Sequence, residues 1–297
     1  MKRKSILIVL SMVFFFGLFA ANLFAQDQDK QITPDKPAVQ EQRVIEEELV
    51  LSDPTVAKPK KWLIGLSGEY WYVSQKWDRY YADGDKYSWG SINGSMPGGT
   101  LSVGYDMFTL SYSYRKGSWD GDSTISARAN SAHQETQSIL NSDQTEHEIL
   151  GRFLFKGANI SPYFLIGYQH LTRSDNETII TPGTVWSNNH NSNQLKSEYT
   201  FKSPLIGLGA IIPFNKYLGM RVDGRLLCTF AEFTRSDGYT ATGTGAGAAL
   251  VGTFYWNIWE GLNVQVGGKY QYMDGGKEIG GFYKYGAFGM LGYVFKF

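Results

Sequence analysis

The sequence has one cysteine, Cys228, and no excess of charge, because it contains 28 basic and 28 acidic residues. One cysteine cannot form a disulfide within the chain, and we expect Cys228 to fill an apolar strand position. The balanced charge gives no electrostatic reason to bind nucleic acid, so we predict no nucleic-acid partner. Beyond residue 25 no apolar run reaches the length of about 20 residues that a membrane-spanning helix needs.

Motifs for phosphate loops, zinc sites and nucleophile elbows are also absent from the sequence. We therefore predict no cofactor and no metal site. The sequence is instead rich in Gly, Tyr, Phe and Trp, while its mean hydropathy is −0.27. A transmembrane β-barrel explains this combination, because lipid-facing and lumen-facing residues alternate and cancel in any hydropathy average.

The N-terminal part shows two segments of different composition. Residues 1–25 begin with Lys2, Arg3 and Lys4, continue with an apolar run and finish on Ala25. This pattern predicts a secretory signal peptide cleaved after Ala25; the alternative, a membrane anchor, requires a longer apolar run. Residues 26–61 are polar, contain four prolines and lack aromatic residues, which predicts a periplasmic arm or linker. Within it, residues 39–51 form either a disordered linker or a short amphipathic helix on a periplasmic partner.

From residue 62 to residue 297 the sequence alternates between apolar and polar residues in a series of segments. A period of two predicts strands with one apolar face. We predict an all-β fold, a transmembrane up-and-down antiparallel β-barrel of about ten strands. The predicted strands cover about residues 62–73, 100–105, 108–115, 145–156, 162–172, 198–212, 218–233, 242–256, 262–273 and 283–297. A change in the alternation near Pro204 predicts a bulge in the sixth strand.

The predicted connections alternate between short and long. The long ones cover about residues 74–99, 116–144, 173–197, 235–241 and 274–280. Outer-membrane barrels have short periplasmic turns and long outer loops, so this rhythm predicts localisation in the bacterial outer membrane. The last strand ends on Tyr293, Phe295 and Phe297 and resembles the closing strand of that class of protein. The resemblance implies that these residues are the signal read by the barrel-insertion machinery.

The inward face of the predicted barrel carries charges of both signs. The residues assigned to this face are Glu69, Glu146, Glu148, Arg152, Arg221, Asp223, Arg225 and Lys269. Side chains nearly fill a barrel of about eight strands, so in a barrel of about ten strands we expect these charges to pair and close the bore. A wide diffusion porin is therefore excluded by the pattern, whereas a narrow substrate-specific channel remains a third functional reading.

The strand rhythm over residues 62–297 resembles that of the omptin family of outer-membrane endopeptidases, with local similarity at residues 167–169, 204–208 and 293–297. The resemblance implies an Asp-x-Asp pair on the second outer loop and an Asp-x-His pair on the fourth, which together activate a water. Asp120 and Asp122 match the first pair, but the second pair is Asp237 and Tyr239. A neutral Tyr cannot act as a general base near pH 7. Solvated turn carboxylates or a weak Ca²⁺ site are alternative interpretations.

These observations predict a barrel with a structural or surface-binding role through its outer loops. The alternative is an omptin-like aspartyl endopeptidase at the outer rim. The expected partners are outer-membrane lipid, lipopolysaccharide, which omptins require for activity, and the insertion machinery.

Overall fold

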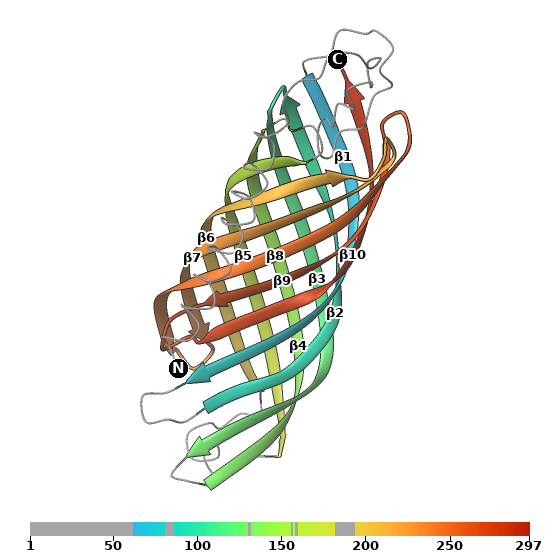
Figure 1. The fold of residues 1–297 in the computed structure, drawn as a ribbon. Helices are drawn as coiled ribbons and strands as arrows, with labels where there is room; N and C mark the ends of the chain where they lie inside the picture. Colours follow the sequence, from blue (N-terminus) through green and yellow to red (C-terminus); the bar gives the residue numbers. More distant parts are fainter. Residues whose placement is uncertain (1–61, 81–85, 130–131, 156, 158–159, 182–193) are drawn as a thin grey trace, which may run out of the picture. The chain divides into compact units, whose positions relative to one another are not determined.

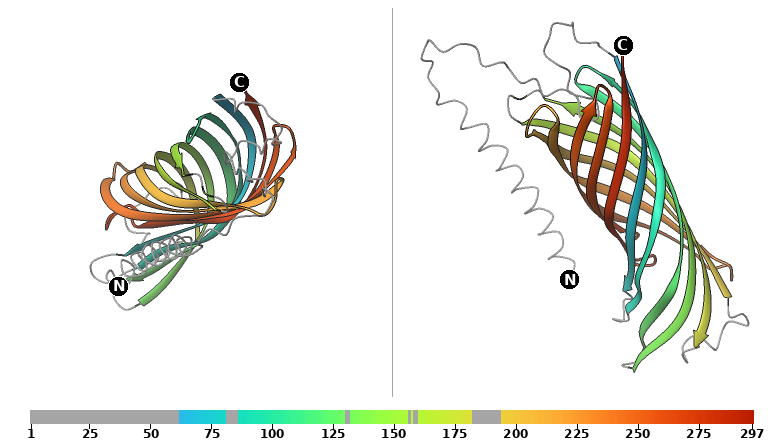
Figure 2. Two further views of the ribbon diagram at one scale, coloured as in Figure 1. Left: turned by 45° about the horizontal axis from the view of Figure 1, so that its top comes forward. Right: turned by 90° about the vertical axis from the view of Figure 1, so that its right-hand side faces the viewer.

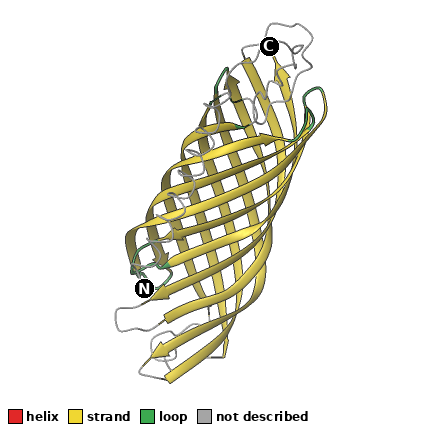
Figure 3. Ribbon diagram, viewed as in Figure 1, coloured by secondary structure: helices red, strands yellow, loops and turns green. Residues whose placement is uncertain are grey.

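The computed structural model describes residues 62–80, 86–129, 132–155, 157, 160–181 and 194–297. The predicted signal peptide, the arm and the segment 39–51 lie outside these residues. The described chain consists almost entirely of strands joined by short connections (Figure 3). Its strands are β1 (Trp62–Tyr80), β2 (Lys86–Tyr105), β3 (Phe108–Ala129), β4 (Ala132–Leu154), β5 (Ser161–Thr181), β6 (Gln194–Pro213), β7 (Leu218–Arg235), β8 (Thr240–Trp259), β9 (Leu262–Asp274) and β10 (Gly281–Lys296).

The strands form a closed antiparallel barrel in which each strand pairs with its neighbours in the sequence (Figures 1 and 2). The barrel closes where β1 pairs with β10, from Leu63 opposite Lys296 to Asp78 opposite Gly281. At the end of this seam the backbone N–H of Phe297 donates to the carbonyl of Trp62 at 3.0 Å. Closure joins the first and last strands of the sheet, as a sheet in lipid requires. The prediction of a barrel of about ten strands is confirmed.

Both chain ends of the barrel, Trp62 and Phe297, lie at the end that carries the tight turns. One of these is the β2–β3 turn, where Asp106 adopts a φ of 51° in the left-handed region that Asp tolerates. The strands project furthest at the opposite end, and outer-membrane barrels carry their longer projections at the cell surface, so we assign the end with Trp62 and Phe297 to the periplasm. No helix in the described part of the chain is long and apolar enough to cross a membrane.

The predicted long outer loops are largely wrong, because most of their residues belong to strands. Strands β2 to β5 extend well past the predicted limits, and the β3–β4 hairpin projects beyond β7 and β8 (Figure 1). The fourth outer connection is a tight turn of Ser236–Tyr239 rather than a loop. The prediction failed because the strands continue above the membrane with polar outward residues, so the outward apolar row that marked the predicted strands is missing there.

The bulge predicted at Pro204 is also wrong. The registers of β6 with β5 and with β7 show no shift there, and odd-numbered residues face inward along the whole of β6. What changes is the chemistry of the two faces. In the outer part Phe201 is buried inside the barrel, whereas toward the periplasm Ile206 and Leu208 are exposed on its outside. The apolar residues change sides while the strand stays in register.

This reversal of the apolar face recurs around the barrel and divides it into two zones. In β7, Arg221, Asp223 and Arg225 face inward near the periplasmic end, whereas Ala231 and Phe233 face inward near the outer end. The outer zone therefore has an apolar core, as a soluble barrel does. Its buried residues include Val73, Trp77, Ile92, Met96, Trp119, Leu140, Leu171, Tyr199, Phe201, Ala231, Phe233, Met273, Ile279 and Phe282.

The periplasmic zone carries the opposite pattern, with large apolar side chains exposed on the outside. Members of this belt include Ile64, Leu66, Leu101, Leu110, Ile149, Ile166, Ile206, Leu208, Leu250, Phe254, Val266 and Leu291. Aromatic residues lie at its two margins, with Trp62, Tyr105 and Trp256 near the turns and Tyr72, Tyr114, Tyr168, Tyr270 and Tyr285 on the other side. A continuous exposed apolar belt bordered by aromatic girdles is the surface that a barrel presents to lipid. The periplasmic zone is therefore the membrane-spanning part.

Candidate functional site in the barrel lumen

A network of buried charges fills the lumen of the membrane-spanning zone, and Glu146 lies at its centre. The carboxylate of Glu146 is fully buried and pairs with Lys284 of β10, with Arg115 Nη1 at 3.1 Å and with Lys269 Nζ at 3.4 Å. Three cations from three strands therefore converge on one carboxylate of β4. The ammonium groups of Lys269 and Lys284 also lie over the ring of Trp71, at 5.3 and 4.7 Å from its centroid.

Arg225 holds the second part of the network. Its Nε donates to Asp223 Oδ1 at 2.6 Å and its Nη1 donates to Glu148 Oε2 at 3.0 Å. Tyr163 OH donates to the other oxygen of Asp223 at 3.1 Å. Because the carboxylates are hydrogen-bonded as well as paired, the large cost of taking them out of water is offset locally.

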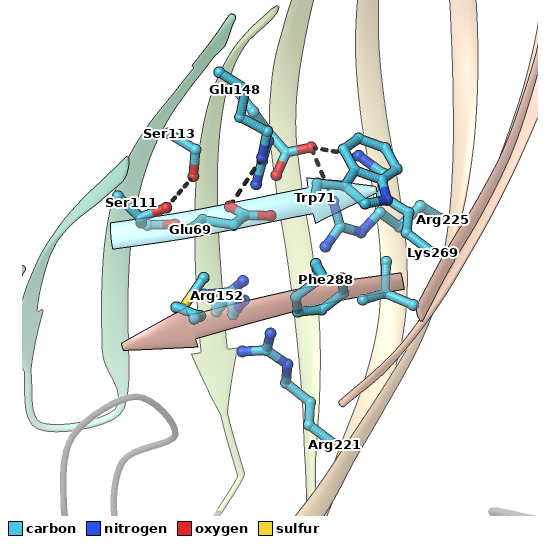
Figure 4. A pocket seen from close by; sticks show the side chains of 14 residues that line it. Glu69, Trp71, Ser111, Ser113, Glu148, Arg152, Arg221, Arg225, Lys269 and Phe288 are labelled. Carbon is cyan, nitrogen blue, oxygen red and sulfur yellow. Dashed lines mark hydrogen bonds and ion pairs between the residues drawn. The ribbon is translucent and has the colours of Figure 1, made fainter. Parts of the chain in front are cut away.

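Glu69 completes the set of buried carboxylates in this zone. It accepts a hydrogen bond from Arg115 Nε at 2.9 Å, so Arg115 links Glu69 to Glu146. Figure 4 shows the carboxylates of Glu69 and Glu148 turned toward basic side chains from neighbouring walls. Every acidic residue that the sequence assigns to the lumen is buried inside the barrel.

Many of these contacts cross the lumen between strands that are not neighbours. Glu146 of β4 reaches Lys284 of β10, and Gln169 of β5 exchanges hydrogen bonds with Gln271 of β9 at 2.5 and 3.4 Å. Side chains from opposite walls thus meet near the barrel axis. The described lumen is occupied by side chains in the membrane zone and by the apolar core above it.

Sequence reasoning missed two central members of the network, Arg115 and Lys284. Lys284 lies at an even-numbered position of β10, on the face opposite to Tyr283 and Tyr285, and the other charged residue on its face is Lys296 at the end of the strand. Arg115 likewise follows Ser111 and Ser113 on the inward side of β3. The position of both residues in the alternation of their strands indicates that they point inward. The alternation does not reveal which carboxylate they contact across the barrel.

The remaining two lumen arginines, Arg152 and Arg221, lie closer to the periplasmic end and line a cavity of about 40 Å³. Arg221 Nη2 contacts Thr253 Oγ1 at 3.5 Å. The other lining residues are Glu69, Trp71, Thr100, Ser111, Ser113, Arg115, Glu148, Arg225, Val251, Lys269, Phe288 and Met290. Figure 4 shows the guanidinium groups of Arg152 and Arg221 extending toward the same region from separate strands.

A smaller polar cluster is embedded in the apolar core of the outer zone. Arg173 Nε donates to Asp175 Oδ1 at 2.7 Å, and Arg173 Nη1 donates to Gln75 Oε1 at 2.7 Å. Ser142 Oγ also donates to Asp175 at 2.7 Å, while the Arg173 guanidinium lies 5.4 Å from the Phe282 ring centroid. The cluster ties β1, β4 and β5 together above the membrane.

The rim residues named by the omptin resemblance occupy separate places. Asp120 is exposed on the outward face of β3, next to the inward Trp119, and Asp122 pairs with Ile139 of β4 through the backbone. Asp237 lies in the β7–β8 turn, where Arg235 donates to its carboxylate at 2.6 and 3.0 Å. Asp120 thus lies on an outward strand face and Asp237 in a paired turn, while the side chain of Asp122 lies outside the described part of the chain.

Tyr239, His147 and His170 make other contacts in the described part of the chain. The ring of Tyr239 packs against Phe233 at 5.9 Å and against the Arg235 guanidinium at 5.3 Å. His147 and His170 face outward on β4 and β5, and Tyr112 OH is 2.8 Å from His147 Nδ1. His190 and the side chain of His133 lie outside the described part of the chain. Within the described ranges no group of three or more His, Cys, Asp or Glu side chains is placed to hold a metal ion.

Comparison with known proteins shows the fold. No protein-family model matches the sequence, and no curated protein matches it. The crystal structure of the outer membrane protease OmpT from Escherichia coli is similar with a TM-score of 0.58 and 13% identity, over 82% of this chain and 99% of that chain. The chain is a bacterial outer-membrane β-barrel.

Two further outer-membrane barrels are similar at a lower level. OprG from Pseudomonas aeruginosa matches with a TM-score of 0.35 and 9% identity, over 80% of this chain and 98% of that chain. Ail of Yersinia pestis matches with a TM-score of 0.32 and 11% identity, over 79% of this chain and 99% of that chain. Together with the exposed apolar belt, the fold places this outer-membrane barrel in the bacterial outer membrane, as predicted.

Proposed function

We propose that this outer-membrane barrel is a closed scaffold that acts at the cell surface, through the strands and connections beyond the membrane, rather than a pore. The observation that supports the proposal is that side chains fill the lumen in both zones of the barrel. Cross-lumen ion pairs around Glu146 and Arg225 occupy the membrane zone, and an apolar core around Phe201 and Phe282 occupies the outer zone. A solute on its way through would have to disrupt both layers.

The outer zone supports a surface-binding role because paired strands carry it beyond the membrane. Strands β3 and β4 stay paired from Phe108 opposite Phe153 to Ala129 opposite Ala132, well beyond the apolar belt. Their outward side chains there are polar, as at Lys116, Asp120 and Asp143, and exposed to solvent. Binding sites presented on strands are held more firmly than sites on long loops.

Three parts of the proposal concern partners and segments. We propose that outer-membrane lipid, lipopolysaccharide included, surrounds the apolar belt, and that the insertion machinery reads the last strand. We also propose residues 1–25 as a signal peptide and residues 26–61 as a periplasmic arm, whose segment 39–51 is available to a periplasmic partner. The exposed aromatic girdles and the closed seam of β1 and β10 support the first two proposals.

Conductance across a planar lipid bilayer tests the closed scaffold. Purified protein should give no stable conductance steps, because charged side chains meet across the lumen. A matched control is the double variant Glu146→Ala with Lys284→Ala, which removes a cross-lumen pair and should give brief, small openings. Stable steps from the wild type would reject the scaffold and favour the narrow channel.

Surface binding is tested by shortening the β3–β4 hairpin while keeping its register. Asp120 and Asn141 are direct partners, so removing residues 121–140 and joining the two strands by a short turn preserves the pairs below. Bacteria that display the wild type should attach to a panel of protein-coated and uncoated surfaces more than bacteria that display the shortened variant. Equal attachment at equal surface abundance would reject this hairpin as the binding element.

A further inference from the structure

The cavity between Arg152 and Arg221 has properties that closure of the lumen does not require. It lies in the membrane zone near the periplasmic ends of β4 and β7, since β4 ends at Leu154 and β7 begins at Leu218. Its volume of about 40 Å³ exceeds the roughly 10–15 Å³ that one water requires. A group larger than one water can therefore occupy it.

The charges around this cavity are unbalanced. Among the described side chains that line it, the cations Arg115, Arg152, Arg221, Arg225 and Lys269 outnumber the carboxylates Glu69 and Glu148. These two carboxylates already have partners, because Glu69 pairs with Arg115 and Glu148 pairs with Arg225. Over the described lumen of the membrane zone as a whole, buried cations exceed buried carboxylates by two charges: the cations are Arg115, Arg152, Arg221, Arg225, Lys269 and Lys284, and the carboxylates are Glu69, Glu146, Glu148 and Asp223. Arg152 and Arg221 are the members of this set near the periplasmic ends of β4 and β7.

Asp223 is the acidic residue nearest to this end, and it does not restore the balance. Its buried carboxylate interacts electrostatically with Arg225, Arg221 and Arg152, so one anion is shared among three guanidinium groups. Arg225 binds it directly at 2.6 Å, and Tyr163 donates to its second oxygen. An excess of buried charge inside a membrane-spanning barrel is costly unless a counter-charge lies close by.

We propose that this cavity, named here the Arg152–Arg221 cavity, binds a small inorganic anion from the periplasmic side. Guanidinium groups suit this role because their planar N–H donors match halide and oxyanion ligands, and they stay protonated at any physiological pH. The apolar core of the outer zone closes the other side, so the anion enters and leaves by one end. The site does not depend on the surface role proposed above.

Thermal unfolding in different salts tests the site with the full-length, detergent-solubilised protein. Ionic strength and pH are held constant while sodium gluconate, whose anion is too large for the cavity, is replaced by sodium chloride or sodium phosphate. The unfolding midpoint of the wild type should rise with the logarithm of the anion concentration, by roughly 5–10 °C at 100 times the dissociation constant. A response to chloride alone identifies a halide site, and a response to phosphate alone identifies an oxyanion site.

Two variants separate this cavity from general salt effects. Arg152→Gln combined with Arg221→Gln removes the positive excess and should abolish the rise. Arg235→Gln, which alters the outer-turn pair with Asp237, should keep it. Equal wild-type midpoints in the three salts, or a rise that persists in the double variant, would overturn the proposal.

A crystallographic measurement on the wild type remains decisive if the double variant does not fold. Crystals soaked in bromide should show an anomalous peak within hydrogen-bond distance of both Arg152 and Arg221. A cavity without such a peak at saturating bromide would overturn the proposal as well.

Discussion

Lys284 of β10 and Glu146 of β4 form a fully buried ion pair across the lumen, between residues 138 positions apart in the sequence. Arg115 and Lys269 share the same carboxylate. The pair thus belongs to a cluster in which one acidic residue neutralises several cations. Its removal should affect the whole lumen rather than one contact.

The variant Glu146→Gln should strongly destabilise the barrel. The amide keeps the shape of the side chain but leaves three buried cations without their shared carboxylate, which costs about 3–5 kcal/mol. The measurement is urea unfolding in detergent, followed by tryptophan fluorescence. Glu198→Gln is the control, because the Glu198 pair with Lys196 is solvent-exposed and such pairs contribute about 0–1 kcal/mol. Similar losses in both variants would mean that the lumen network does not stabilise the barrel.

The variant Phe201→Ala should show that the outer zone is a packed core. Phe201 is buried and stacks on Phe282 with ring centroids 5.9 Å apart, so truncation should cost about 3–5 kcal/mol. Phe230→Ala is the matched control, because Phe230 lies on the same barrel but is 48% exposed toward lipid. The midpoint of heat-induced unfolding on gels reports both. A larger loss for Phe230→Ala would contradict the assignment of the core.

Peptidase activity should be absent from the wild type, from Asp120→Ala and from Tyr239→His. The physical reason is placement: Asp120 faces outward on β3, and Arg235 holds the Asp237 carboxylate in its turn. Cleavage of dibasic peptides in the presence of lipopolysaccharide is the assay. Wild-type cleavage that disappears in Asp120→Ala would restore the endopeptidase interpretation.

Deletion of Phe297 should reduce the amount of folded barrel in the outer membrane. The backbone of Phe297 closes the β1–β10 seam on Trp62, and its side chain ends the aromatic row of Tyr293 and Phe295. The folded fraction is measured by heat-modifiable migration of outer-membrane extracts. Phe297→Tyr keeps an aromatic terminus and should assemble normally, whereas an unchanged yield after deletion would separate the residue from assembly.

The sequence predicted the periplasmic half of each strand well and the outer half poorly. In the membrane zone lipid imposes apolar outward residues, so the alternation of Leu66, Gly68 and Tyr70 could be recognised directly. Above the membrane the outside of the barrel faces water, so the outward residues are polar. The apolar residues there, such as Trp119 and Leu140, point inward instead. The same switch near Pro204 imitates a bulge.

The inward position of the lumen residues could be predicted from the alternation of each strand, but their partners could not. Glu146, Asp223 and Arg225 stand at inward positions of strands whose registers follow from the tight turns. The meeting of β4 with β10 and of β5 with β9 depends on how the closed sheet brings opposite walls together. The local sequence does not show which strands lie opposite each other in the closed barrel. For this reason the pair of Lys284 with Glu146 could not be predicted.

The reversal of the apolar face has a consequence for how the chain enters the membrane. The hairpins that end up outside pass the membrane plane during assembly, and their inner rows, such as Trp119 and Leu140, are apolar. The charged rows that follow, around Glu146 and Arg225, are tolerated in the membrane only once both walls face each other. We therefore expect the outer hairpins to translocate before the charges meet, so that pairing of the lumen is the last and locking step of assembly.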